Sequence, residues 1–126
     1  MNRRTFDAEG HITNSLGDYP EAVRQLAREE NLAMIDLNAM SKPFYEALGK
    51  DKSKLAFAPG DGTHHNNYGS YELAKCIVEG IRQAKLPLAT HLQDGLPEFD
   101  PSHPDPIEDF KLPPSPGAPG SKPDGN

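Results

Sequence analysis

The sequence predicts one α/β domain over residues 1–96, followed by a proline-rich acidic tail over residues 97–126. Three observations support this prediction. Helical and strand-like hydrophobic patterns follow one another along residues 18–83. Nine of the 13 prolines come after Leu96, and proline lacks the N–H that helix interiors and central strands need. The chain of 126 residues is long enough for one domain, and its single cysteine excludes an intrachain disulfide.

Charge and hydropathy exclude several classes of partner. The net charge is −6, and the tail supplies −4 of it through six acids against two lysines. No basic face is visible, which argues against nucleic acid and anionic membranes as partners. No stretch approaches the roughly 18 apolar residues of a membrane span. Residues 1–7 are basic but lead into no apolar run, so they are not expected to be a signal peptide.

The first elements follow from turn and cap signals. Residues 5–14 are polar and are expected to form an extended loop or short hairpin with Glu9-Gly10 at its tip. Asp18 is the expected N-cap of a helix that runs to about residue 30, with Glu21 placed as in a capping box. Asn31 is the expected C-terminal cap. The pattern Leu32-Ala33-Met34-Ile35-Asp36-Leu37 predicts a buried strand, most simply a parallel one.

Two further helices are expected after this strand. One starts at Asn38 or Ser41 and ends at Gly49, and its apolar side holds Phe44, Tyr45, Ala47 and Leu48. The other covers residues 70–83 and has the clearest amphipathic pattern. Its expected buried face is Tyr71, Ala74, Ile77, Val78 and Ile81, and its expected outer face is Glu72, Lys75, Glu79 and Arg82.

Two further expectations concern the strand's missing neighbours and the course of the tail. A single strand leaves backbone groups unpaired on both edges, so the sequence calls for more strands than it contains. In the tail, apolar residues are spaced as anchors that would hold residues 86–112 along a folded surface, whereas residues 113–126 are expected to be disordered. The expected anchors are Leu96, Phe99, Ile107, Phe110 and Leu112.

The candidate functional residues are Asp61 and His64, in a Gly- and Asn-rich turn that leads into the last helix. An imidazole whose tautomer is fixed by a carboxylate is the arrangement of a general base. The spacing also fits an aspartate that caps the helix beside an exposed histidine. A metal site with His65 is disfavoured, because adjacent histidines tend to point apart and no second ligand cluster follows. No serine follows an apolar strand in a tight glycine turn, and Cys76 is expected to be a packed thiol.

Several runs together resemble the SGNH, or GDSL, hydrolase superfamily. Asp61-Gly62-Thr63-His64 followed by Asn67-Tyr68-Gly69-Ser70 is similar to its last Asp-x-x-His block. The wider set resembles rhamnogalacturonan acetylesterase-like proteins from Arg3 to about Pro116. That set comprises Arg3-Arg4-Thr5-Phe6-Asp7, Gly17-Asp18-Tyr19-Pro20-Glu21-Ala22-Val23-Arg24, Ile35-Asp36-Leu37, Tyr45-Glu46-Ala47-Leu48-Gly49 and Phe99-Asp100-Pro101-Ser102-His103-Pro104-Asp105-Pro106.

The resemblance implies a flavodoxin-like α/β/α sandwich and a secreted or periplasmic serine esterase. Such an enzyme removes acetyl groups from pectic polysaccharide without metal or cofactor. By position, His64 corresponds to the base and Asp61 to its orienter. The blocks for the serine nucleophile and the oxyanion hole have no counterpart here, so the chain is interpreted as the C-terminal portion of such an enzyme, inactive alone. The alternative is a small non-catalytic α/β module whose tail docks a partner through Phe99, Ile107 and Phe110.

Overall fold

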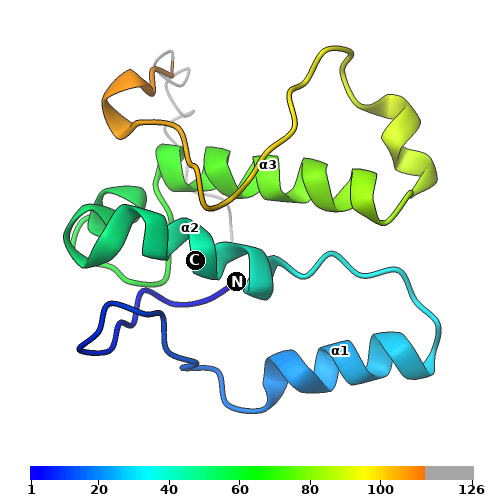
Figure 1. The fold of residues 1–126 in the computed structure, drawn as a ribbon, viewed down its shortest axis with the longest axis horizontal. Coiled ribbons are helices and arrows are strands. Elements are labelled where there is room, and N and C mark those ends of the chain that lie inside the picture. The colour runs from blue at the N-terminus through cyan, green and yellow to red at the C-terminus, as the bar shows by residue number, and fades with distance from the viewer. Residues whose placement is uncertain (113–126) are drawn as a thin grey trace, which may run out of the picture.

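The computed structural model describes residues 1–112, where the chain forms three α-helices (Figure 1). They are α1 (Tyr19–Glu29), α2 (Leu37–Lys52) and α3 (Asn67–Gln83), with 3₁₀ turns η1 (Ser53–Ala56), η2 (Pro87–His91) and η3 (Ile107–Asp109). Helix α2 packs on α3 and η1, whereas α1 stands apart (Figure 1). No helix in this part of the chain is long and apolar enough to cross a membrane. The disorder expected for residues 113–126 lies outside the described residues.

The N-terminal hairpin and α1 form where their turn signals predict them. Phe6 and Ile12 make an isolated antiparallel bridge around the Glu9-Gly10 tip, where Gly10 has φ +90°. Asp18 is the N-cap of α1, but its side chain makes no capping bond. The expected capping box is therefore wrong. Glu21 instead pairs with arginines one and two turns further along the helix.

The ends of α1 and α2 depend on local backbone geometry. Asn31 adopts φ +50° just beyond the C-cap of α1, in the left-handed conformation that terminates helices. Helix α2 begins earlier than predicted, because Asp36 acts as its N-cap and accepts the backbone N–H of Ala39 at 2.9 Å. Gly49, the predicted end of the helix, interrupts α2 with φ +72° and ψ 171°, but the helical turns resume up to Lys52.

The predicted strand over residues 32–37 does not form, and no β-strand occurs within residues 1–112. Residues 32–36 are irregular between α1 and α2, and no described residue bonds the backbone N–H of Ala33, Met34 or Ile35. A strand needs a neighbour to satisfy these groups, and the described part of the chain offers none. The described structure is thus helical, and the α/β prediction is not borne out by it.

The core lies where α2, η1 and the start of α3 meet, and it is rich in aromatic rings. Phe44 and Tyr45 are fully buried, with ring centroids 5.2 Å apart, and Tyr45 lies 5.3 Å from the ring of Phe57. Ala47 is exposed, so its predicted place on the buried side of α2 is wrong. The buried cluster comprises Ile12, Phe44, Tyr45, Ala56, Phe57, Tyr68 and Leu73.

Helix α3 buries a face that matches the predicted one only in part, since Ile81 is buried as expected whereas Tyr71 and Ala74 are exposed. Glu72 is fully buried, although its charge predicts an outer position, and Tyr71 is exposed. The buried face instead carries small residues that allow close packing. A Cβ at Gly80 would overlap the side chain of Ile35, and one at Gly69 would overlap the carbonyl oxygen of Ala56. Backbone approach at these two glycines therefore sets the rotation of α3.

The buried carboxylate of Glu72 is paired with a cation that also binds the tail. The Lys75 ammonium lies 2.9 Å from carboxylate oxygens of both Glu72 and Asp105. Tyr68 donates its hydroxyl to the Asp105 carbonyl at 2.8 Å. Burial raises the pKa of Glu72. These contacts hold the segment before η3 on α3, as expected for residues 86–112.

The predicted tail anchors differ in their contacts. Ile107 and Phe110 pack against the core, and the Phe99 ring lies 4.3 Å from the Lys75 ammonium. Leu96 and Leu112 are exposed, so they are not anchors.

Candidate active site

The loop that carries Asp61 and His64 is fixed at both ends. Phe57 and His65 form an isolated antiparallel bridge, and the Ala58 N–H donates to the His64 carbonyl at 2.9 Å. Asn66 closes the loop as the N-cap of α3, where its side chain accepts a backbone N–H at 3.1 Å. A short loop bridged at its base and continued by a helix has few ways to rearrange, so it can hold a functional side chain in place.

Asp61 and His64 are in direct contact within this loop. Asp61 Oδ2 lies 2.6 Å from His64 Nδ1. Asp61 Oδ1 accepts the backbone N–H groups of Thr63 at 2.6 Å and His64 at 3.1 Å. The His64 side chain is otherwise 81% exposed. The aspartate therefore orients the imidazole, while the backbone orients the aspartate.

This arrangement fixes the charge of Asp61 and the tautomer of His64. The bond from His64 and the two backbone N–H bonds hold the pKa of Asp61 well below its usual range. An ionised carboxylate at Nδ1 favours the tautomer with the proton on that nitrogen. Nε2 is then the acceptor nitrogen, so the pair has the geometry of a base with its orienter.

The adjacent His65 has a different environment. Its Nε2 lies 2.7 Å from the Tyr45 hydroxyl, and its ring centroid is 4.3 Å from that of Phe57. Burial lowers the pKa of His65 to about 4, so the ring is neutral near pH 7. Within residues 1–112, no group of three or more His, Cys, Asp or Glu side chains could hold a metal ion. His65 thus packs half-buried against the core residues Tyr45 and Phe57 beneath the loop, a role that the sequence pattern does not reveal.

No nucleophile accompanies His64 in the described part of the chain, where its ring bonds only Asp61. Ser41 and Ser53 are fully buried and bond backbone carbonyls. Cys76 is also buried, and burial raises the pKa of its thiol to about 11, which confirms that it is a packed thiol. The described residues thus hold an aspartate–histidine pair without an attacking group beside it.

A second Asp-x-x-His turn occurs in the tail, and sequence reasoning missed it although the spacing is the same. Asp100 Oδ2 lies 2.8 Å from His103 Nδ1. The backbone and hydroxyl of Ser102, together with His103, lower the pKa of Asp100 to about 2. The pair borders a cavity of about 530 Å³ between α3 and the tail. Ser102 Oγ approaches the same Nδ1 at 3.1 Å, so the three groups do not form a relay through both ring nitrogens.

The chain is similar in sequence to known esterases. It is 40% identical over 105 residues to rhamnogalacturonan acetylesterase RhgT of Bacillus subtilis, an alignment that covers 73% of this chain and 45% of RhgT. It is 36% identical over 83 residues to the probable rhamnogalacturonan acetylesterase YesY of the same organism, covering 63% of this chain and 38% of YesY. A third relative, the uncharacterised esterase YxiM, is 28% identical over 78 residues, which are 62% of this chain and 20% of YxiM.

These similarities confirm the resemblance that the motifs predict. The chain spans less than half the length of each of these relatives. No protein-family model and no solved structure matches it.

Proposed function

From this relationship to rhamnogalacturonan acetylesterases, we propose that the chain is the C-terminal portion of a serine carbohydrate acetylesterase with an SGNH α/β/α fold. It provides the base, His64, and its orienter, Asp61. The nucleophilic serine and the oxyanion donors come from residues outside this sequence. The observation that carries the proposal is the 2.6 Å contact between Asp61 Oδ2 and His64 Nδ1, with Asp61 Oδ1 held by two backbone N–H groups.

The proposed chemistry is acyl transfer in two steps. The serine hydroxyl attacks the acetyl carbonyl while His64 Nε2 accepts its proton. The imidazolium, stabilised by Asp61, then gives this proton to the sugar oxygen as the ester bond breaks. In the second step His64 activates water, which releases acetate from the serine. The proposed substrate is an acetylated pectic polysaccharide met outside the cytoplasm, as the resemblance implies.

The alternative, a module whose tail docks a partner, is less consistent with the structure. It depends on Phe99, Ile107 and Phe110, and these side chains pack on the chain itself. They are therefore partly buried against the chain itself, and the acetylesterase proposal is preferred.

The test is a fused polypeptide that joins the part of RhgT outside the matched span to this chain. Acetate release is measured from an aryl acetate and from acetylated rhamnogalacturonan. We expect His64→Ala to lower kcat on the order of 10⁵-fold or more, and Asp61→Asn to cost on the order of 10⁴-fold or less. The exposed His91→Ala is the matched control and should leave kcat unchanged. Activity should also fall in acid, because a protonated imidazole cannot accept the serine proton.

Two results would overturn the proposal. One is full activity of the fused polypeptide after His64→Ala. The other is robust acetate release, sensitive to serine-directed inhibitors, by these 126 residues alone.

A further inference from the structure

The cavity between α3 and the tail has the composition of a small-molecule site. Its volume is about 530 Å³, and such sites commonly have about 300–1,000 Å³. Tyr71, Lys75 and Val78 line it from α3, whereas Leu96 and Phe99 line it from the tail, which runs beside this helix (Figure 1). Apolar and aromatic walls with a few charged groups are typical of ligand pockets. We call this cavity the tail cavity.

The two walls of the tail cavity are joined by polar contacts at both ends. At one end the Lys75 ammonium lies 2.9 Å from Asp105 Oδ2. At the other end Arg82 donates to the backbone carbonyls of Leu96 at 2.7 Å and Pro97 at 2.9 Å. The tail is therefore fixed over α3 on either side of the cavity, so a ligand would not have to order it.

The charge of the tail cavity disfavours an anionic ligand. Among the described residues that line it, Glu98, Asp100 and Asp105 carry carboxylates, and Lys75 carries an ammonium. Hydrogen bonds within its own turn lower the pKa of Asp100 to about 2, so this carboxylate is ionised near pH 7. The Lys75 charge is already shared between Asp105 and the buried Glu72. A bound anion would add to an excess of negative charge and would be repelled.

The aromatic rings of the tail cavity already hold a cation. The Lys75 ammonium lies 4.3 Å from the ring centroid of Phe99 and 5.2 Å from that of Tyr71. A ligand cation would bind best over these ring faces, and there it would meet the charge of Lys75. The cavity therefore favours a neutral ligand.

The polar groups of the tail cavity suit hydroxyl groups. Glu98 is exposed, so its carboxylate oxygens are available to accept hydrogen bonds. Asp100 Oδ2 lies 2.8 Å from Nδ1 of His103 and favours the proton on that nitrogen, which leaves Nε2 as an acceptor. A hydroxyl group donates to such acceptors without carrying a charge. A sugar ring presents hydroxyl groups at its edge and C–H groups on its faces, and the C–H groups match the apolar walls at Val78 and Leu96.

We infer that the tail cavity binds a neutral sugar and discriminates against sugar acids. This inference goes beyond the proposed function, because the described residues that line the cavity come from α3 and the tail and not from the loop of Asp61 and His64. In the proposed acetylesterase, the site would hold a neutral sugar of the polysaccharide away from the reacting ester.

The test titrates the isotope-labelled 126-residue chain with three probes and follows the backbone amide chemical shifts by NMR. D-galactose and D-galacturonate are a matched pair, because galacturonate has a carboxylate where galactose has a hydroxymethyl group. Tetramethylammonium is the cationic probe. We expect galactose to cause saturable shifts at residues 71–78 and 96–105. Galacturonate and tetramethylammonium should bind at least about fivefold more weakly.

One pair of variants locates the site. Phe99→Ala removes an aromatic wall and should weaken galactose binding by at least about fivefold. Leu88→Ala changes an exposed leucine of η2 that does not line the cavity, and it should leave the affinity unchanged.

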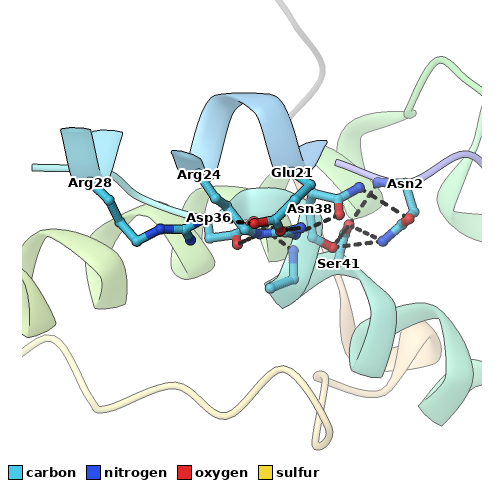
Figure 2. A network of polar contacts seen from close by, with 8 residues as sticks. Asn2, Glu21, Arg24, Arg28, Asp36, Asn38 and Ser41 are labelled. Atoms are coloured by element: carbon cyan, nitrogen blue, oxygen red, sulfur yellow. Dashed lines mark hydrogen bonds and ion pairs between the residues drawn. The ribbon is translucent and has the colours of Figure 1, made fainter. Parts of the chain in front are cut away.

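A second pair of variants tests the selection by charge. Glu98→Gln removes one negative charge from the cavity, so the preference for galactose over galacturonate should fall by at least about twofold. Glu21→Gln makes the same change on α1, where Glu21 pairs with Arg24 and Arg28 (Figure 2), and it should keep the preference.

Three results would contradict the inference. They are the absence of saturable shifts with galactose, equal or tighter binding of galacturonate or tetramethylammonium, and unchanged galactose binding in Phe99→Ala. If the amide spectrum shows that Phe99→Ala does not fold, Glu98→Gln decides, and an unchanged preference in that variant rejects the site. None of these measurements depends on acetate release, so the inference and the acetylesterase proposal can fail separately.

Discussion

Replacing Gly69 by alanine tests how closely α3 approaches the loop that carries the Asp61–His64 pair. Gly69 is buried in the first turn of α3, and a Cβ there would overlap the backbone carbonyl of Ala56 and lie 2.9 Å from Cδ2 of His65. The Ala56 carbonyl also accepts the Asn66 N–H at 3.2 Å. A backbone group that is already bonded cannot move aside as a flexible side chain can.

The expected loss is the difference between two effects. An alanine inside a helix is favoured over glycine by roughly 0.5–1 kcal/mol. Overpacking a tight site costs typically about 1–3 kcal/mol, and the rigid carbonyl of Ala56 places Gly69→Ala at the upper end. The overlap therefore outweighs helix propensity. We expect the free energy of unfolding to fall by about 2 kcal/mol.

The measurement is urea unfolding followed by circular dichroism. With an m-value of about 1–3 kcal/mol/M, the midpoint of Gly69→Ala should fall by roughly 1 M. Gly62→Ala is the matched control, because its nearest neighbour would be an ordinary 3.8 Å contact with Arg4 and its midpoint should stay near wild type. Equal midpoints for the two variants would show that α3 does not approach the backbone of Ala56 as described.

Two further predictions concern stability. Because burial lowers the pKa of His65 to about 4, the unfolded chain binds a proton between about pH 4 and 6.5 that the folded chain does not. Stability should therefore fall with falling pH in this window, by roughly 1–3 kcal/mol. His65→Phe should remove this dependence in urea unfolding, whereas exposed His91→Ala should keep it. Arg24→Ala should cost about 1–2 kcal/mol and speed amide exchange in α1, because Arg24 ties that helix to Asp36. Arg28→Ala, at an exposed ion pair, should cost less than about 0.5 kcal/mol, and equal effects would contradict the anchoring role of Arg24.

The features predicted well from sequence are those determined by neighbouring residues. The three helices begin and end within a few residues of the predicted positions, because capping residues and glycine or asparagine turns act locally. The contact between Asp61 and His64 is local too, since the backbone N–H groups that hold Asp61 lie two and three residues after it.

The predictions that failed concern features that depend on residues far away in the sequence. Glu72 is buried because Lys75 and Asp105 surround it, and Asp105 lies in the tail, 33 residues away. A helical wheel places such a charge in solvent, since it includes only residues on the same helix. The predicted strand at residues 32–37 failed for a related reason. Its hydrophobic pattern is present, but strand formation needs a second backbone that the described residues do not contain.

The two Asp-x-x-His turns show why spacing alone does not identify an active site. Both bring a carboxylate to Nδ1 of a histidine, at 2.6 Å for Asp61 and 2.8 Å for Asp100. They differ in the contacts that hold each turn in place. The loop of Asp61 is bridged at its base by Phe57 and His65 and runs directly into α3, whereas the bonds that hold Asp100 come from the neighbouring Ser102 and from His103. A base must keep its position while a proton moves, so the scaffold beneath the pair, more than the pair itself, favours the first turn as the catalytic one.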